Sequence, residues 1–414
     1  MRECDSLQVS PHPTSRSSRV TTHWIASRRR NLAAACLAHI LHDGYTDQLY
    51  ALLPVWQSQF GLSYAALALV RALYYGTMGG LQAPGNRMIA KLSPRMALAL
   101  ATLIAAAGYL VVACPAGFPG LCAGLVIAGI GSSVQHPRAS LLVTNTYGGA
   151  SRGPLGIYNF TGDLGKAAFP ALVALLLTVL KWQSVVLVMA LVGFGVAFAL
   201  LALAPRQPPI VPVNLPSAMN AAANKGFGLL LTIGALDTAT RMGYLLFLPF
   251  LLRARGGTQA TVGLGLGLLF IGGAMGKAVC GWLGQHLGVE WSVIITEAAT
   301  ALLMAGSLTF PLAPMLAVLP ILGIVLNGTS SVLYGTVPSL APGANIGHAF
   351  AVFYTGVIGA GALAPIVYGA IADRTSRTMG ILAAALTAAV IIPLVFALHP
   401  ALKENHGEFA EMEP

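Results

Sequence analysis

Twelve long apolar segments, separated by short polar connections, make up most of this sequence. A helix that crosses the hydrocarbon core of a bilayer needs about 20 predominantly apolar residues, and each segment supplies about that many. The sequence therefore predicts an all-α membrane protein with twelve transmembrane helices. The segments lie at about residues 32–56, 63–83, 96–113, 118–143, 154–180, 183–204, 226–251, 259–283, 290–310, 314–339, 347–371 and 379–398.

The composition supports a membrane protein and argues against a nucleic-acid partner. Charged residues make up 9% of the chain, hydrophobic residues make up 56%, and the mean hydropathy is +0.75. A soluble domain carries about 25% charged residues, so lipid rather than water is the main solvent. Much of the formal net charge of +10 lies in the N-terminal tail and in loops, where basic residues set membrane topology.

The sequence lacks the patterns that mark enzymes and metal proteins. Its 5 cysteines mostly fall in apolar segments and show no disulfide framework or metal-ligand spacing. There is no nucleophile–base constellation and no phosphate-binding loop, and the glycine-rich stretches lie within apolar segments rather than after strands. We therefore expect no enzyme, no cofactor and no metal site.

The apolar segments form two groups of six on either side of a Pro-rich polar stretch. We predict a basic cytoplasmic tail (1–31), an N-terminal six-helix bundle (32–204), a cytoplasmic linker (205–225), a C-terminal six-helix bundle (226–399) and a cytoplasmic C-terminal tail (400–414). Lys and Arg concentrate on the cytoplasmic side of membrane proteins. With the N-terminal tail inside, basic residues favour that side, although the second half alone does not fix the orientation.

The two halves share an internal repeat, which is the most specific signal in the sequence. Three pairs of motifs occur in the same order, in spans 1 and 7, 4 and 10, and 5 and 11. This order predicts two parallel six-helix repeats with a pathway between them. The matching residues are Asp43, Asp47, Tyr50 and Pro54 with Asp237, Arg241, Tyr244 and Pro249; Ser132, Ser133, Val134 and Pro137 with Ser330, Ser331, Val332 and Pro338; and Thr161, Gly162, Gly165 and Pro170 with Thr355, Gly356, Gly359 and Pro365.

Two carboxylates lie four residues apart inside the first apolar segment. On a helix, Asp43, Asp47 and Tyr50 share one face. Placing a carboxylate in a membrane costs roughly 2.5–3.5 kcal/mol or more, so we predict a proton-coupling site that faces a water-filled pathway. His42 belongs to this prediction because the adjacent carboxylate favours its protonated form. The alternative is a helix end held at the membrane interface.

The fifth segment adds a second carboxylate with a cation beside it. Asp163 and Lys166 lie three residues apart and can pair on one helix face. We predict that Asp163 is a further proton-coupling residue; the alternative is a structural ion pair that fixes helix packing. Lys277 lies in a glycine-rich segment typical of close helix packing, and it needs a partner that the sequence does not identify.

The remaining candidates are predicted to bind substrate, either as cations for an anionic group or as hydroxyl groups that line the site. Arg71 can instead snorkel to the interface, and His136 can be a packing or capping residue at a broken helix. Asp237 and Arg241 can simply satisfy each other. The predicted substrate-binding residues are Arg71, Tyr50, Tyr74, Tyr75, His136, Lys166, Asp237, Arg241, Tyr244 and Lys277.

The six-plus-six pattern with this repeat resembles the major facilitator superfamily over most of the chain after about residue 32. Finer features resemble its fosmidomycin-resistance branch of drug exporters: Asp43 to Pro54 followed by FGLS at 60–63, GIGSSVQHP at 129–137, and a glycine-rich fifth span. The resemblance implies alternating access by two rocking bundles, and the glycine pattern partly resembles the antiporter motif of superfamily exporters. Spans 3, 6, 9 and 12 are peripheral in the resembled fold, so Glu297 is interpreted as structural.

The sequence also departs from the superfamily pattern. The loop motif GxLxDRxGR is degraded between spans 2 and 3, where Ala90 replaces the Asp, and between spans 8 and 9, where Gln285 and His286 replace Asp and Arg. A cleaner copy, GAIADR at 369–374, follows span 11 instead. Val126 stands near the place where many proton-coupled members carry an arginine. The resemblance therefore does not extend to the usual gating salt bridges at the cytoplasmic loops.

These observations favour a multi-pass transporter of the bacterial inner membrane that acts as a monomer. We expect a proton-coupled antiporter that exports a small anionic or zwitterionic compound, with that molecule, protons and the bilayer as its partners. The first alternative is a proton symporter that imports a small metabolite with the same fold and carboxylates. The second is a membrane receptor or scaffold, which the degraded loop motifs favour and the intramembrane charges oppose.

Overall fold

The computed structural model of the chain describes residues 15–114, 116–205, 208, 225–341 and 346–410. Every regular element in this part of the chain is helical, as the apolar segments predict. The elements are α1 (Ser15–Asp47), α2 (Leu49–Phe60), α3 (Tyr64–Gly80), α4 (Gln82–Met88), α5 (Pro94–Ala113), α6 (Gly117–Ser133), α7 (Gln135–Tyr147), η1 (Gly148–Ala150), α8 (Arg152–Leu176), α9 (Trp182–Leu203), α10 (Lys225–Ala254), α11 (Gln259–Ser307), α12 (Leu312–Leu340), α13 (Ile346–Arg374) and α14 (Arg377–Ala410).

The helix ends differ from the predicted boundaries at several places. The first helix begins at Ser15, within the predicted tail, and α14 continues through Ala410. Residues 1–14 and 411–414, and most of the predicted linker at 205–225, lie outside the described residues. The predicted first span is divided into α1 and α2 at Gln48, and the fourth into α6 and α7 at Val134. Conversely, α11 covers two predicted spans, which non-helical backbone at Gly288 separates (φ 77°, ψ 171°); glycine adopts this positive φ without steric cost.

Among the described residues, seven helical stretches are long and apolar enough to cross a membrane: Pro94–Ala113, Gly117–Ala150, Trp182–Leu203, Gln259–Ser307, Leu312–Leu340, Ala349–Arg374 and Arg377–Lys403. Helices α1, α8 and α10 carry several of the predicted site residues and are not among the seven. Each ionisable residue lowers the mean hydropathy of its helix. A criterion based on length and hydropathy therefore identifies these helices less readily as membrane spans. The number of twelve spans stays a prediction.

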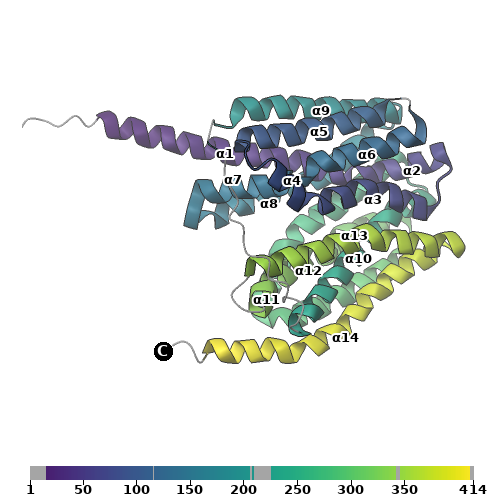
Figure 1. Ribbon diagram of the computed structural model, residues 1–414. Coiled ribbons are helices and arrows are strands. Elements are labelled where there is room, and N and C mark those ends of the chain that lie inside the picture. Colours follow the sequence, from purple (N-terminus) through teal and green to yellow (C-terminus); the bar gives the residue numbers. More distant parts are fainter. Residues whose placement is uncertain (1–14, 115, 206–207, 209–224, 342–345, 411–414) are drawn as a thin grey trace, which may run out of the picture.

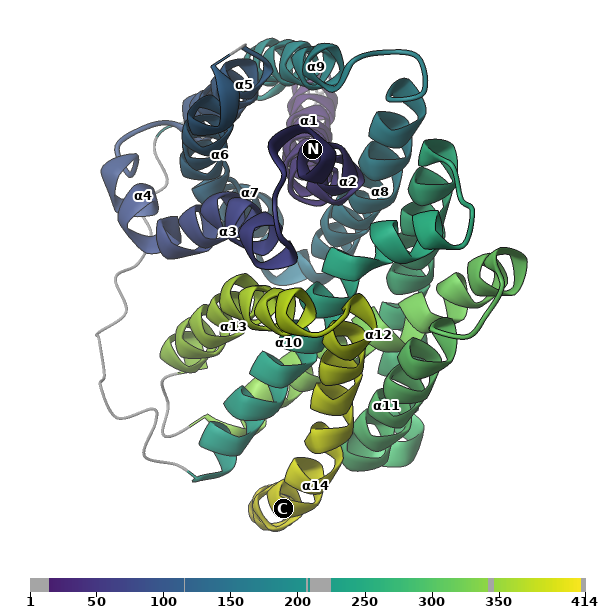
Figure 2. The same ribbon diagram turned by 90° about the vertical axis from the view of Figure 1, so that its right-hand side faces the viewer.

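The helices gather into two bundles, α1–α9 and α10–α14, which lie side by side in both ribbon views (Figures 1 and 2). Within the first bundle, α5 packs against α6 and α9, and α1 packs against α8. Within the second, α11 packs against α12, and α10 against α13 and α14. The bundles meet mainly where α3 contacts α13 and α8 contacts α11.

Glycines allow α11 and α12 to approach until their backbones touch. A Cβ atom built on Gly272 would overlap the Pro320 carbonyl group, and one on Gly323 would overlap the Leu269 carbonyl group. In lipid, where apolar burial gives little drive for helix association, such small-residue contacts are a main source of packing energy. The glycine-rich segment around Lys277 is therefore a close helix–helix contact, as its composition predicts.

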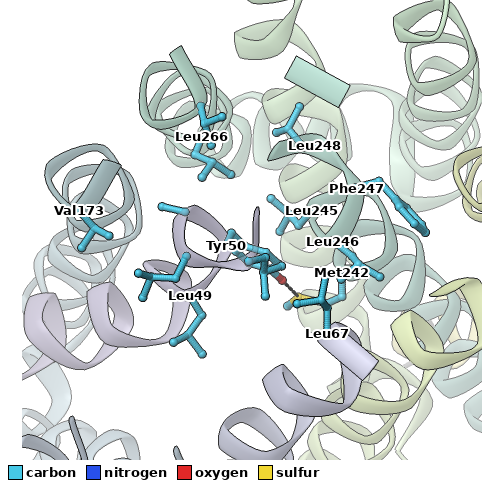
Figure 3. Close-up of a cluster of buried hydrophobic side chains, with 14 of the residues drawn as sticks. Leu49, Tyr50, Leu67, Val173, Met242, Leu245, Leu246, Phe247, Leu248 and Leu266 are labelled. Atoms are coloured by element: carbon cyan, nitrogen blue, oxygen red, sulfur yellow. Dashed lines mark hydrogen bonds between the residues drawn. The ribbon is translucent and has the colours of Figure 1, made fainter. Parts of the chain in front are cut away.

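An apolar cluster fills the space between the bundles, where α2 of the first bundle packs against α10 of the second (Figure 3). Leu49 and Tyr50 of α2 face Leu245 and Leu246 of α10 there, and the Tyr50 hydroxyl group donates to Met242 Sδ over 3.3 Å. All of these side chains are almost fully buried. The cluster therefore seals the bundles against each other.

Polar contacts hold the bundles together at the end of the molecule beyond this seal. The Asp373 carboxylate at the end of α13 accepts hydrogen bonds from the backbone N–H groups of Tyr64 and Ala65, at 2.8 and 2.9 Å. These N–H groups open α3, where a carboxylate also interacts favourably with the helix dipole. Gly369 lies against the same turn, and a Cβ atom there would come within 2.6 Å of Ala65 N. We call this contact the Asp373 cap.

Candidate functional site

A cavity lies between the two bundles on the other side of the seal. On α8 and α10, the residues that line the cavity come before the residues of the seal in the sequence. The cavity therefore lies on the side of the seal that faces the start of α1 (Figure 1). Both bundles contribute side chains, and most of them are polar or charged. The lining residues are Asp163, Lys166, Arg241, Phe270, Gly273, Lys277, Asn327 and Ser330.

A chain of ion pairs runs through the site and joins the bundles. Lys166 Nζ lies 3.2 Å from Asp43 Oδ2 and 3.5 Å from Asp163 Oδ1. Lys277 Nζ, from the second bundle, lies 2.6 Å from Asp163 Oδ2. The Asp163–Lys166 pair expected from the i, i+3 spacing is present, and Asp163 is the partner of Lys277 that the sequence did not identify. The exposed fraction is 9% for the Asp163 side chain and 41% for that of Lys277, so the lysine end of this link reaches solvent.

Two histidines surround the Asp43 carboxylate together with Lys166. His39 Nε2 lies 3.3 Å from Oδ2, and His136 Nε2 lies 3.4 Å from Oδ1. The His39 Nδ1 atom contacts the Tyr158 carbonyl oxygen at 2.7 Å, and the imidazole stacks on the Tyr158 ring. His136 lies in the first turn of α7, just after the break at Val134, and is also next to a predicted proton-coupling carboxylate. Sequence reasoning missed His39, although its i, i+4 spacing from Asp43 was a usable signal.

The same three side chains are the one group with the geometry of a metal site among the described residues. The ligand atoms of His39, Asp43 and His136 all lie within 4.8 Å of one another. However, the Lys166 ammonium group already pairs with the Asp43 carboxylate. A divalent cation bound there would meet this positive charge at short range, which opposes binding. We therefore interpret the group as a cluster of ion pairs and hydrogen bonds around the Asp43 carboxylate.

His42 does not join this group. Its ring nitrogens lie 2.9 Å from Ser132 Oγ and 3.1 Å from Thr102 Oγ1, so both are engaged by hydroxyl groups of α6 and α5. Adjacent helix residues point about 100° apart, which explains why His42 and Asp43 face different neighbours. Asp47 lies one turn beyond Asp43 and is buried, and no ion pair to it occurs in the described part of the chain.

Arg71 lies between the bundles rather than at a membrane interface, so it does not snorkel. Its side chain is 1% exposed, its guanidinium group stacks on the rings of Tyr50 and Tyr75, and its Nη1 donates to the Gly361 carbonyl oxygen at 3.3 Å. Tyr50 and Tyr75 thus stack on a buried cation, but none of these three residues lines the cavity.

The other two predicted tyrosines also lie outside the cavity lining. Tyr74 contacts Ser132 Oγ inside the first bundle at 2.8 Å. Tyr244 is fully buried in the second bundle, and its hydroxyl group has no hydrogen-bond partner among the described residues. Neither residue lines the cavity, because the face of each helix that carries them packs into a bundle core.

Arg241 lines the cavity, whereas Asp237 lies buried behind it. The Arg241 Nη2 atom donates to Thr238 Oγ1 at 3.3 Å, and no ion pair within 4.0 Å links Arg241 to Asp237 among the described side chains. The two therefore do not form the direct pair considered as an alternative. Asn327 and Ser330 of α12 also line the cavity and were missed; the repeated serine motif of spans 4 and 10 was the available signal.

Comparisons with known proteins agree with this architecture. The sequence model of the Major Facilitator Superfamily matches residues 35–232 and 230–414. The fosmidomycin resistance protein of Escherichia coli (strain K12) is 24% identical over 365 residues, which cover 83% of this chain and 87% of that protein.

Solved transporter structures share the fold. A bacterial homologue of the human lysosomal transporter Spinster, in an inward-facing and occupied conformation, superposes with a TM-score of 0.73 at 15% identity and covers 92% of this chain and 98% of its own. A POT family transporter in complex with a thioalcohol-conjugated peptide superposes with a TM-score of 0.75 at 14% identity, over 90% and 96%. At such identities the likeness concerns the fold alone. The match of the family model to both halves shows that this chain is a multi-pass membrane transporter, not an enzyme, and that it belongs to the Major Facilitator Superfamily.

Proposed function

We propose that the chain is a proton-coupled antiporter that exports a small anionic or zwitterionic compound by alternating access. The single observation that carries this proposal is the Asp163–Lys277 ion pair, which links the bundles at the cavity. A link of this kind can respond to a substrate and to a proton, because either one can replace a partner in it. The likeness to a fosmidomycin resistance protein supports export of a small drug-like compound.

Antiport requires that the proton and the substrate exclude each other. A zwitterion whose ammonium group pairs with Asp163 competes directly with a proton for that carboxylate. Its anionic group would pair with Lys277 or Arg241, which line the same cavity. A substrate with only negative charge would pair with Lys277 and favour a proton on Asp163, which is the linkage of a symporter, so antiport through this ion pair applies to the zwitterionic class. Symport and antiport thus differ in whether substrate binding favours or opposes protonation of the carboxylate.

Growth assays test the proposal in a strain that lacks its own exporters. Wild-type protein is expected to raise tolerance to fosmidomycin, and Asp163→Asn and Asp43→Asn are each expected to remove at least about 90% of that gain, a tenfold loss that corresponds to about 1.4 kcal/mol. The matched control is Glu290→Gln, a carboxylate-to-amide change at a residue that pairs with His399 away from the cavity. All proteins must reach equal membrane levels. Increased sensitivity with wild type would support import by symport instead.

The domain division and the topology belong to the same proposal. We propose bundles at 32–204 and 226–399 joined by a cytoplasmic linker, with both termini in the cytoplasm of a bacterial cell and the protein in its inner membrane as a monomer. The structure would then be open toward the cytoplasm, because the cavity lies on the side of the seal from which α1 begins. A protease site placed in the linker should be cut in inside-out vesicles and protected in intact spheroplasts; the reverse result would invert the topology.

A further inference from the structure

A second cavity lies at the end of the molecule beyond the apolar seal, beside the Asp373 cap; Figure 2 faces this end. Its volume is about 410 Å³, which is within the range of sites for small molecules. Helices α2 and α3 of the first bundle and α10 and α14 of the second contribute to its wall. We call it the Arg253–Arg377 pocket, and its lining residues are Pro54, Gln57, Ser58, Tyr64, Phe250, Arg253, Ala254 and Arg377.

The pocket carries positive charge without a balancing carboxylate. Its lining includes two arginines and no acidic residue, and neither arginine takes part in an ion pair within 4.0 Å among the described side chains. Arg253 Nη2 donates to Gln259 Oε1 at 2.8 Å, and Arg377 Nη1 donates to the Phe250 carbonyl oxygen at 3.1 Å. A guanidinium group has five N–H donors, so both side chains keep donors for a ligand.

The stability of its own helix does not explain why Arg377 occupies its position. Arg377 is the first residue of α14, where the helix dipole is positive and disfavours a cation. Arg253 lies in the last turn of α10, where the dipole favours a cation. An anion in the pocket would interact favourably with both guanidinium groups and with the positive end of α14.

The charges at this end of the C-terminal bundle also depart from the usual distribution in membrane proteins. In the proposed topology this end faces outward, where Lys and Arg are normally less frequent. The carboxylate of Asp373 is engaged by the cap on α3, and Arg255 donates to the Leu308 carbonyl group. A ligand between two of the arginines accounts for part of this excess. The charged residues at this end of the bundle are Arg253, Arg255, Arg374, Arg377 and Asp373.

We propose that the Arg253–Arg377 pocket binds a phosphate or phosphonate group at a site separate from the transport cavity. Guanidinium groups match pairs of oxygen atoms on such tetrahedral anions, and here they come from two different helices. Gln57 and Ser58 supply neutral polar groups from α2. The apolar seal separates this pocket from the cavity that contains Lys277.

An anion in this pocket favours the state in which the bundles meet at this end. The walls come from both bundles, so they separate when the bundles part. Gln259, which accepts from Arg253, also donates to the Ala51 carbonyl oxygen of α2 at 2.9 Å. A ligand shifts an equilibrium toward the state that binds it better. This step rests on the proposed alternating access, whereas binding of the anion does not.

Equilibrium dialysis with radiolabelled inorganic phosphate, in a detergent without phosphate and at constant ionic strength, tests the site. Wild-type protein should bind phosphate saturably, and Arg253→Gln and Arg377→Gln should each weaken binding at least about tenfold. The matched control Arg374→Gln removes the same charge from an exposed arginine outside the lining, and it should change the affinity less than about threefold. If Arg377→Gln does not fold, the exposed Arg253 alone gives the comparison.

Three results would overturn the site. They are no saturable binding by wild type, an equal loss in the Arg374→Gln control, and a loss in Lys277→Gln without a loss in Arg253→Gln. The last result would place the phosphate in the transport cavity instead.

Nanodiscs distinguish a free anion from a lipid headgroup, which carries the same phosphate group. The ionic strength must screen the surface charge of the bilayer. Equal phosphate binding in phosphatidylcholine and phosphatidylglycerol nanodiscs would assign the site to a free anion. Loss in phosphatidylglycerol nanodiscs alone would assign it to an anionic headgroup, and loss in both would overturn the site in a membrane.

Labelling with maleimide tests the conformational step in a background whose 5 cysteines are replaced by serine. Leu67 is fully buried in the seal and does not line the pocket, so Leu67→Cys should react only when the bundles part at this end. Saturating phosphate should slow the reaction at least about threefold, and Arg253→Gln should remove this effect. An unchanged rate with phosphate bound would overturn the conformational step alone. No reaction under any condition would contradict the proposed alternating access, and the dialysis result would still decide the site.

Discussion

Replacing Lys277 with glutamine is expected to lower the rate of export at least tenfold more than it lowers the amount of folded protein. The change removes the partner that lies 2.6 Å from Asp163 and breaks the ion pair that links the bundles at the cavity. Because the Lys277 side chain is 41% exposed, solvent screens the lost charge, and the cost to folding stays below the 3–5 kcal/mol of a fully buried pair. Transport of a phosphonate into everted vesicles, with and without a pH gradient, measures the effect.

Three further variants separate the role of charge from the role of the side chain. Lys277→Arg keeps the charge and should retain part of the export. Asp163→Asn/Lys277→Gln has a neutral pair that can still hydrogen-bond, so it should fold and exchange labelled substrate without responding to the pH gradient. Lys181→Gln removes a lysine from the loop before α9 and should behave as wild type. Gradient-driven export by the neutral pair at the wild-type rate would show that coupling lies elsewhere.

Replacing Gly272 with alanine should cause one of the largest losses of stability among the methyl groups that could be added to the described part of the chain. The new Cβ atom would overlap backbone atoms of Pro320 on α12, which cannot move aside as a flexible side chain can. Forcing extra volume into a packed contact costs about 1–3 kcal/mol, or more where backbone must shift. We expect a lower melting temperature in detergent and a smaller yield of monodisperse protein, as measured by thermal unfolding and size-exclusion chromatography.

Gly281→Ala is the matched control on the same helix. A Cβ atom at Gly281 meets nothing within 4 Å, and its backbone is helical, so the substitution should leave the melting temperature unchanged or raise it. Gly→Ala at a compatible helical site stabilises by about 0.4–1 kcal/mol. Equal destabilisation by both changes would mean that helix propensity, rather than close packing of α11 on α12, explains the first result.

Much of the fold could be predicted because lipid imposes a simple rule on sequence. Apolar runs of sufficient length predict helices, and the repeat of motifs predicts two similar bundles. The breaks within helices were less predictable. The division at Gln48 has no proline or glycine at the break itself, whereas the kink at Gly288 falls in the gap predicted between spans 8 and 9.

The candidate site was predictable in its residue types but not in its pairings. The i, i+3 spacing of Asp163 and Lys166 is local, so the sequence predicted their contact. The partner of Lys277 depends on how two bundles dock, and the two residues are 114 positions apart. Tyr74 and Tyr244 were assigned to the site from their neighbours in sequence, whereas small rotations of a helix decide whether such a ring faces the cavity or a bundle core.

If the transporter alternates between two faces as proposed, the Asp373 cap makes that equilibrium adjustable from the end of the molecule opposite the cavity. Its two hydrogen bonds exist only while the bundles are in contact there, so their free energy favours one of the two faces that the transporter presents. Each 1.4 kcal/mol gained or lost shifts the ratio of the two states tenfold. Asp373→Asn keeps the shape of the side chain but weakens its bonds, so a cysteine placed near Tyr64 should react faster with an impermeant maleimide. In the proposed alternating-access cycle, these exposed hydrogen bonds add to the buried apolar seal, so the rate of turnover can change without any change in the residues that line the cavity.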